Sequence, residues 1–270
     1  MFSVLSSGAG GNGVSGTLSS ASGSPTSGEL SSGASTTIPL YQKGRLPAET
    51  ISAVSARFWS SACSTAGNGA ASGYVPAALG EGGQTKAIEI NRETDPLFGR
   101  QPPQPTKAGL NRLRKLVKES DSHLGVALSA DGRAIGVADN QGDSVSLLDM
   151  TLLLAQYLNR QYRQRGVIVA STPDGAAEAA AGIRAWEEAS GLKVELSADP
   201  AARIAELLNQ DRNSLLVGTT AAGEITLGRY SSSPDATLVA LILIESVARA
   251  GVRLRALLDE MKGRSVKREP

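Results

Sequence analysis

The order of apolar segments repeats along the chain. From Tyr41 onward, segments with strand-like patterns alternate with segments with helix-like patterns, in the order strand, helix, strand, helix, hairpin, long apolar helix. The hairpin segments begin at 124 and 215 and the long helices after them begin at 147 and 236, about 90 residues apart in each case. Such alternation predicts sheets covered by helices on both faces, and each hairpin makes its sheet mixed. We therefore predict an α/β protein with two tandem three-layer α/β/α domains.

The limits of single elements follow from caps, turn residues and apolar periodicity. Thr106 is placed to cap a helix with an apolar stripe at Leu110, Leu113 and Val117. The first half is predicted to contain helices at 48–56, 72–79 and 106–119 and strands at 58–64, 86–90, 124–128 and 134–138. The second half is predicted to contain helices at 147–158, 174–191, from 200 onward and at 236–250, and strands at 167–170, 192–196, 215–217 and 224–228.

The N-terminal segment has a different composition from the rest. Residues 1–37 contain 12 Ser and 8 Gly, and their only charged residue is Glu29. A segment of this kind buries too little apolar surface to offset its ordering entropy, so we predict a disordered Ser/Gly-rich tail at 1–40, before domains at 41–145 and 146–270. The start lacks the basic residues and the apolar stretch of about 7–15 residues of a signal peptide, so a cytoplasmic location is expected. A misplaced start site, or the remnant of a lost segment, is the less favoured explanation of the tail.

Composition excludes several classes of protein. Hydrophobic residues make up 41% of the chain, which argues against a wholly disordered protein. No apolar run reaches the roughly 18 residues of a membrane helix, so no membrane partner is expected. The net charge of +1 lacks the excess of basic residues that is typical of nucleic-acid-binding proteins, so no nucleic acid is expected as a partner. One cysteine and one histidine exclude a disulfide framework and metal sites built from several thiolates or imidazoles.

Several motifs in this order resemble those of the phosphohexomutases, the family of phosphoglucomutase and phosphomannomutase. They are a Gly-rich turn, a Glu-Ile-Asn stretch, a proline-rich loop and two strands that flank a hairpin turn: Gly69-Ala70-Ala71-Ser72-Gly73, Glu89-Ile90-Asn91, Asp95-Pro96-Leu97-Phe98-Gly99-Arg100-Gln101-Pro102-Pro103-Gln104-Pro105, Leu124-Gly125-Val126-Ala127-Leu128 and Ile135-Gly136-Val137-Ala138-Asp139. The resemblance runs from about Leu46 to Lys262 and corresponds to the family's second and third domains.

The resemblance implies a reaction and the parts that carry it. In the family, a phosphoserine in domain one transfers phosphate to a hexose phosphate, a magnesium ion is held by domain two, domain three binds the sugar and domain four binds the substrate's phosphate. Neither the donor motif Thr-Ala-Ser-His-Asn-Pro nor the phosphate loop Arg-x-Ser-Gly-Thr occurs in this sequence. We therefore expect the phosphoserine domain and the phosphate-binding domain to be lost.

The two family loops that fall within the chain are degenerate. The metal loop Asp-Gly-Asp-Gly-Asp-Arg falls on Ser129 to Ala134, where the three carboxylate positions hold Ser129, Asp131 and Arg133. Magnesium prefers several oxygen ligands, so we expect Asp131 to be a turn residue, with no metal and no cofactor. The sugar loop Gly-Glu-x-Ser-Gly falls on 218–222, where Gly218 is followed by Thr219 and Ala221 in place of the Glu and the Ser. Glu224 follows on the next strand and is not assigned the sugar-binding role.

Other polar residues receive structural interpretations. Arg100 is the one candidate for an anion contact, although support of the proline-rich loop is the simpler role. His123 has no partner motif, Cys63 lies in an apolar strand, and Asp235 is placed to cap the last long helix. The basic residues of the 106–119 helix fit a solvated face: Arg112, Arg114, Lys115 and Lys118.

Two functions from different classes remain open. The first is a non-catalytic binding or scaffolding module related to hexose-phosphate metabolism, with no enzymatic activity of its own. The second is an accessory or regulatory component of a sugar-nucleotide pyrophosphorylase or of an active phosphoglucomutase or phosphomannomutase. Both functions imply a protein partner from sugar-nucleotide or hexose-phosphate metabolism.

Overall fold

The computed structural model describes residues 60–80, 85–100, 102–173 and 176–263. The chain divides into two units, Met1–Ile38 and Pro39–Pro270, and all described residues belong to the second. The predicted tail and the predicted helix at 48–56 lie outside the described residues. Within these residues, no helix combines the length and the apolar character that a bilayer-crossing segment needs.

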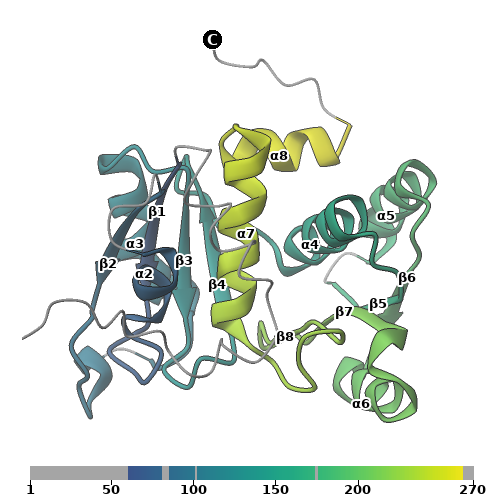
Figure 1. Ribbon diagram of the computed structural model, residues 1–270, viewed down its shortest axis with the longest axis horizontal. Coiled ribbons are helices and arrows are strands. Elements are labelled where there is room, and N and C mark those ends of the chain that lie inside the picture. Colours follow the sequence, from purple (N-terminus) through teal and green to yellow (C-terminus); the bar gives the residue numbers. More distant parts are fainter. Residues whose placement is uncertain (1–59, 81–84, 101, 174–175, 264–270) are drawn as a thin grey trace, which may run out of the picture. The chain divides into compact units, whose positions relative to one another are not determined.

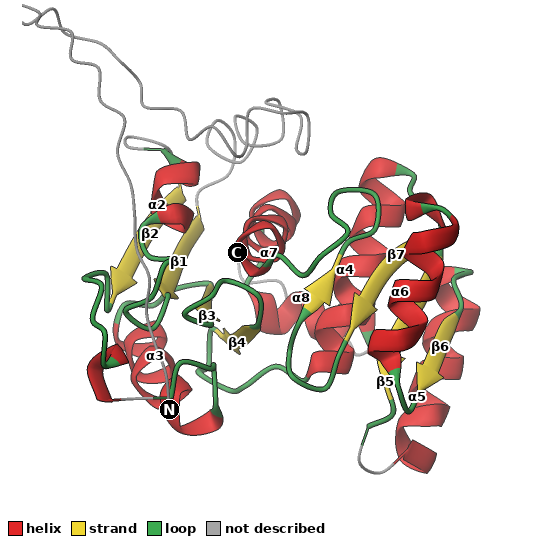
Figure 2. Ribbon diagram, turned by 90° about the horizontal axis from the view of Figure 1, so that it is seen from below, coloured by secondary structure: helices red, strands yellow, loops and turns green. Residues whose placement is uncertain are grey.

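Two four-stranded sheets form the framework, and they share one topology (Figures 1 and 2). The first sheet has the order β2-β1-β3-β4 and the second has the order β6-β5-β7-β8. In each sheet the first three strands are parallel and the last is antiparallel, which confirms the prediction of mixed sheets. The strands are β1 (Ser60–Thr65), β2 (Thr85–Ile90), β3 (Leu124–Leu128), β4 (Ile135–Asp139), β5 (Val167–Ser171), β6 (Val194–Ser197), β7 (Leu215–Thr219) and β8 (Ile225–Thr226).

Helices cover both faces of each sheet. The α-helices are α2 (Tyr74–Leu79), α3 (Lys107–Glu119), α4 (Leu147–Tyr162), α5 (Ala176–Ser190), α6 (Pro200–Gln210), α7 (Ala236–Ala250) and α8 (Leu254–Met261), with short 3-10 helices at Phe98–Arg100 and Arg212–Ser214. In the second half, α4 packs on β5 and β7, and α6 packs on the opposite face. Figure 1 shows α5 beside α4, on the side of the second sheet away from α6.

The alternation of side chains along β3 divides the core of the first sheet. Leu124, Val126 and Leu128 face the main apolar cluster, whereas Ala127 faces a smaller cluster under α3. The stripe predicted from the sequence, Leu110, Leu113 and Val117, is buried in this smaller cluster, and Thr106 caps α3 by accepting a hydrogen bond from Gly109 N at 3.2 Å. The three-layer arrangement of the first half is therefore built on the expected face of α3.

Helix α7 crosses from the second half of the chain to the first sheet. It packs against α2, β1 and β3, on the face of the sheet opposite α3. Figure 1 shows α7 running between the two sheets. Its residues 236–248 are all buried, as expected for a helix that is apolar on every side. The main apolar cluster therefore contains residues from both halves, including Val126 and Ile225.

Candidate functional site

The turn between β3 and β4 is the position where the sequence suggests a degenerate metal loop. Gly132 N donates to Ser129 O at 2.9 Å, and Ser129 N donates to Ala134 O at 2.8 Å. Gly132 has a φ of +71°, a left-handed conformation that glycine adopts without steric cost. The backbone thus forms a closed turn that Asp131 and Gly132 favour, as the sequence predicts.

Ser129 and Asp131 use their oxygen atoms inside this turn. The buried Ser129 Oγ donates to Asp131 Oδ1 at 2.5 Å and accepts from Ala134 N at 2.8 Å. Asp131 Oδ1 also accepts from Arg133 N at 3.2 Å. The hydrogen bond from Ser129 holds the pKa of Asp131 below its ordinary value, and the amide and charge of Arg133 add to this effect. The carboxylate is therefore ionised and already engaged by its own loop.

Arg133 joins this loop to the hairpin of the second sheet. Its Nε lies 3.0 Å from Glu224 Oε1, with the side chains 54% and 27% exposed. Backbone contacts accompany the pair, because Ile135 N donates to Gly223 O at 3.0 Å and Ala134 forms an isolated β-bridge with Glu224. The edges of the two sheets meet here, while each remains a separate four-stranded sheet.

Two more segments close on the same turn. Ala70 N donates to Ala130 O at 2.9 Å, and Ala130 N donates to Pro103 O at 2.8 Å. At Gly69 a Cβ would lie 2.3 Å from Ala130 Cα, so the Gly-rich turn needs glycine there. These loops follow the carboxyl ends of β1 and β3, the switch point of the sheet where ligands of open α/β folds bind. In this chain, the backbone at Gly69 lies close against Ala130 at that point.

The sugar-loop positions of the sequence also serve packing. A Cβ on Gly218 would lie 2.5 Å from Ile204 Cγ1 of α6, and the Thr219 hydroxyl lies 2.7 Å from the Thr151 hydroxyl of α4. Ala221 is exposed and offers no polar side-chain group. The hydroxyl of Thr220 is buried without a hydrogen-bond partner among the described atoms. The positions that would bind sugar hydroxyls in the family thus hold one buried hydroxyl and one methyl group.

The residues at the metal-loop positions do not fit magnesium. A hard divalent cation needs several oxygen ligands and compensating negative charge, whereas Ser129 and Asp131 are hydrogen-bonded to each other and Arg133 brings positive charge. Across the described ranges, no group of three or more His, Cys, Asp or Glu side chains is arranged to hold a metal ion.

Arg100 lies in the proline-rich loop, three residues before Pro103. It ends the 3-10 helix Phe98–Arg100 after β2, its side chain is exposed, and its backbone has a φ of +58°. Its amide donates to Leu97 O at 2.8 Å, so its backbone helps to close the turn at this point of the loop. No hydrogen bond or ion pair of its guanidinium is found within the part of the chain that the structure describes. An anion contact at Arg100 stays a prediction.

His123, Cys63 and Asp235 take part in packing and capping. Ser61 N donates to His123 Nδ1 at 3.2 Å, and burial lowers the pKa of this imidazole. The buried Cys63 Sγ lies 3.2 Å from the Ser122 hydroxyl, as expected for a core cysteine. Asp235 accepts from Leu238 N at 2.9 Å and caps α7, as the sequence predicts.

The Arg133–Glu224 pair is the contact that sequence reasoning misses. The two residues are 91 positions apart, and Glu224 precedes β8 rather than lying in it. The sequence repeat offers one signal for this pair: residues of opposite charge stand at matching places, just before the last strand of each hairpin. Because the repeat alone does not say that the two hairpins touch, the pair could not be derived from it.

Comparison with known proteins finds relatives among the mutases that the sequence motifs resemble. Residues 61–142 match the family model described as phosphoglucomutase/phosphomannomutase, alpha/beta/alpha domain II. A probable phosphoglucosamine mutase of Pyrococcus abyssi is 27% identical over 186 residues, which are 69% of this chain and 39% of that protein. The phosphoglucosamine mutase of Bacillus velezensis is 26% identical over 150 residues, 56% of this chain and 32% of its own length. The chain thus spans about two fifths of the Pyrococcus relative.

Solved structures show the same fold over a longer part of the chain. A putative phosphomannomutase from Thermus thermophilus superposes with a TM-score of 0.65 at 20% identity, covering 80% of this chain and 50% of that one. A phosphoglucomutase/phosphomannomutase family protein from Burkholderia thailandensis has a TM-score of 0.58 at 18% identity, covering 81% and 46%. Residues 61–142 thus match the second domain of the phosphoglucomutase/phosphomannomutase family, and the fold of the chain over a longer stretch is similar to that of the solved structures of this family.

Proposed function

We propose that this chain is a non-catalytic member of the phosphohexomutase family, a cytoplasmic binding or scaffolding module related to hexose-phosphate metabolism. One observation carries the proposal: at the third carboxylate position of the metal loop stands Arg133, and its guanidinium is paired with Glu224 at 3.0 Å. A group transfer that relies on a metal at this loop would have to proceed with a positively charged side chain at one of the positions that hold the metal's carboxylate ligands in the family.

Phosphoryl transfer depends on positioned donors and on cations that neutralise developing charge. At this loop the single aspartate is hydrogen-bonded to Ser129, and Ala130 lies close against Gly69. When several groups act together in a transition state, the effects of removing them on the rate are not additive. One remaining carboxylate therefore does not preserve a proportionate fraction of the rate. The surviving hydrogen bonds hold the two hairpins together, which supports a structural role for the former site.

The proposal is tested by the reaction of the family. Purified chain is incubated with magnesium, glucose 1,6-bisphosphate and either glucose 1-phosphate, mannose 1-phosphate or glucosamine 1-phosphate, and the products are followed by phosphorus NMR. We expect no 6-phosphate above the protein-free background. An active mutase in the same buffer is the positive control.

Turnover above about 1 s⁻¹, the low end for typical enzymes, contradicts the proposal if Asp131→Ala abolishes it. Asp131→Ala separates the chain's own activity from a contaminating mutase, because a contaminant is unaffected by the substitution. If the chain instead raises the rate of an added pyrophosphorylase or mutase from the same organism, the accessory function replaces scaffolding as the better description.

A further inference from the structure

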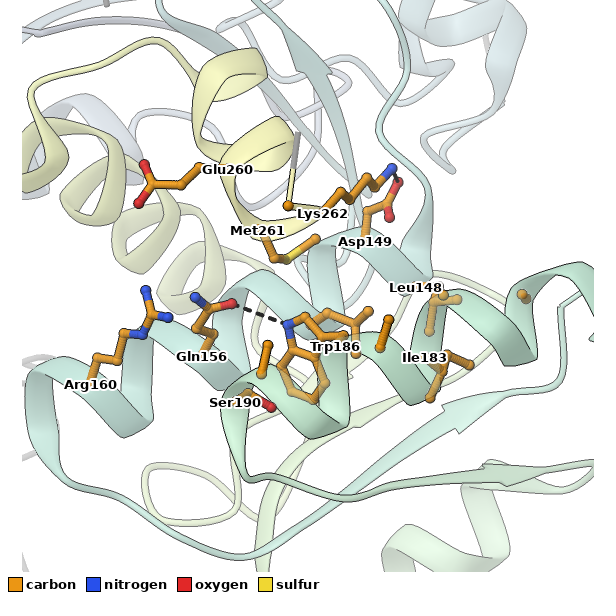
Figure 3. Close-up of a pocket in the computed structure, with 16 residues that line it drawn as sticks. Leu148, Asp149, Gln156, Arg160, Ile183, Trp186, Ser190, Glu260, Met261 and Lys262 are labelled. Atoms are coloured by element: carbon orange, nitrogen blue, oxygen red, sulfur yellow. Dashed lines mark hydrogen bonds and ion pairs between the residues drawn. The ribbon is translucent and has the colours of Figure 1, made fainter. Parts of the chain in front are cut away.

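A cavity lies on the helical layer of the second sheet, and none of the loop residues described above lines it. It is a groove of about 560 Å³ between α4, α5 and the end of α8 (Figure 3). Leu148 and Leu152 of α4, Ile183 and Trp186 of α5 and Met261 of α8 give it an apolar lining. Small-molecule sites in proteins commonly have volumes of about 300–1,000 Å³ and a lining of this type.

Gly182 is one of the residues that line this groove. It lies within α5, where a glycine costs about 1 kcal/mol relative to alanine. A Cβ at this position would meet no atom within 4 Å, and the residue is not among those with a positive φ. Neither backbone conformation nor packing within the described chain therefore requires glycine here. The absence of a side chain at this position leaves the adjoining part of the groove open to a ligand.

One end of the groove presents hydrogen-bond donors. Trp186 Nε1 donates to Gln156 Oε1 at 3.1 Å, and since an indole N–H can only donate, the amide oxygen of Gln156 is fixed toward it. The NH₂ group of Gln156 then faces Arg160, as Figure 3 shows. Arg160 is exposed, and its guanidinium has no hydrogen bond or ion pair to the residues that the structure describes. An amide NH₂ beside a guanidinium is suited to binding a carboxylate.

The surrounding charges restrict the position of an anion to this end. Lys262 is neutralised by Asp149 at 2.7 Å. Glu260 lies near Arg160, and both also line an adjoining cavity of about 230 Å³ that Arg249 of α7 borders. Arg249 donates to the buried Glu245 at 2.7 Å, so its charge is largely compensated. Arg160 is thus the cation available to a ligand, and Glu260 works against an anion placed there.

We propose that this groove binds a small amphipathic carboxylate, with a flat apolar body against Trp186 and Ile183 and its acid group on Arg160 and Gln156. The site is separate from the loop of Arg133 and does not depend on the proposed function. Its ligand differs from a sugar phosphate in having an apolar body and a single carboxylate.

The probe for the test is 2-naphthoate, with 2-naphthalenemethanol as its uncharged counterpart. Trp59→Phe leaves Trp186 as the single tryptophan, so the indole N–H signal in a nitrogen–proton NMR spectrum reports on the groove. We expect naphthoate to shift this signal saturably, and to bind about tenfold more tightly than the alcohol, the equivalent of one charge-assisted hydrogen bond of about 1.4 kcal/mol. Calorimetry supplies the two dissociation constants.

Three variants identify the site. Arg160→Gln is expected to remove the preference for naphthoate over the alcohol, whereas Arg184→Gln, an exposed arginine of the same helical layer that does not line the groove, keeps it. Gly182→Leu fills the groove and is expected to abolish binding of both compounds without lowering the melting temperature. If that variant does not fold, Ala185→Leu, which adds bulk at an exposed lining position, supplies the same test.

Equal affinity for the acid and the alcohol, an unchanged preference in Arg160→Gln, or unchanged binding in a folded groove-filling variant would each overturn the proposal. Absence of any binding at millimolar naphthoate would overturn it as well. Because no sugar phosphate enters this experiment, its outcome is independent of the mutase assay above.

Discussion

Arg133 shows how one side chain changes the chemistry of a whole loop. Its guanidinium is a cation, so the loop carries positive charge where a metal-binding sequence would carry negative charge. The pair that it forms with Glu224 is partly exposed, and such pairs contribute about 0–1 kcal/mol to stability. Its main effect is therefore on what the loop can bind rather than on how stable the protein is.

Placing carboxylates at all three of these loop positions should create a magnesium site. In Ser129→Asp/Arg133→Asp, three carboxylates surround the turn, and we expect 10 mM magnesium to raise the melting temperature by about 3–6 °C. This corresponds to about 1.4 kcal/mol for a dissociation constant of about 1 mM. Differential scanning calorimetry measures it, with the native chain and Arg133→Asp alone as controls that do not respond. A response of the native chain that Asp131→Ala removes would refute our view of the loop.

Asp131 should make stability depend on acidic pH. Its folded-state pKa is lowered, chiefly by the hydrogen bond from Ser129, so its contribution is complete above the unfolded value of about 3.9 and is lost as pH falls through the lower folded value. Asp131→Asn is expected to be less stable than the native chain at pH 6. The difference should shrink steadily below about pH 4. Urea unfolding of both proteins from pH 6 to pH 2.5 measures it, and a difference that grows in acid contradicts the assignment.

At the level of elements, the periodicity of the sequence predicts most helices and strands. The helix at 236–250 has the predicted limits, and α4 runs four residues beyond its predicted end at 158. The last strand is shorter than predicted, because Tyr230 and Ser231 donate to Leu227 O and turn the chain away. Helix α8 is not among the elements that the sequence predicts, although Leu254, Leu258 and Met261 form a short buried stripe. Which sheet α7 covers could not be predicted, since a helix apolar on all sides carries no directional signal.

The close contact of β3 with α3 gives a prediction at this level. A Cβ on Gly125 would lie 2.5 Å from Val117 Cγ2, and the β-branched Val117 has little freedom to move in a buried helix. We expect Gly125→Ala to destabilise the fold by about 1–3 kcal/mol. Gly182→Ala is the matched control and should be neutral or stabilise by up to about 1 kcal/mol, because its Cβ meets no neighbour. Equal effects in urea unfolding would show that the close contact is not what limits substitution.

For the molecule as a whole, the position of α7 predicts that the two sheets unfold together in one cooperative transition. Leu243 of α7 is 1% exposed and belongs to the apolar cluster that both halves share. Leu243→Ala should cost about 2–5 kcal/mol. Hydrogen exchange should show the same loss of protection in β3 and in β7, which belong to different sheets. A loss confined to one of the two strands would mean that the halves unfold independently.

The crossing of α7 also determines how a gene for this protein can be divided. A cut between codons 145 and 146, where the repeat of the sequence divides, leaves the first sheet on one fragment and the helix that covers its face on the other. Each fragment expressed alone would expose apolar surface and aggregate, whereas the two expressed together hold all the parts of one shared core. The repeat in the sequence is consequently not a unit that can be copied, exchanged or expressed by itself.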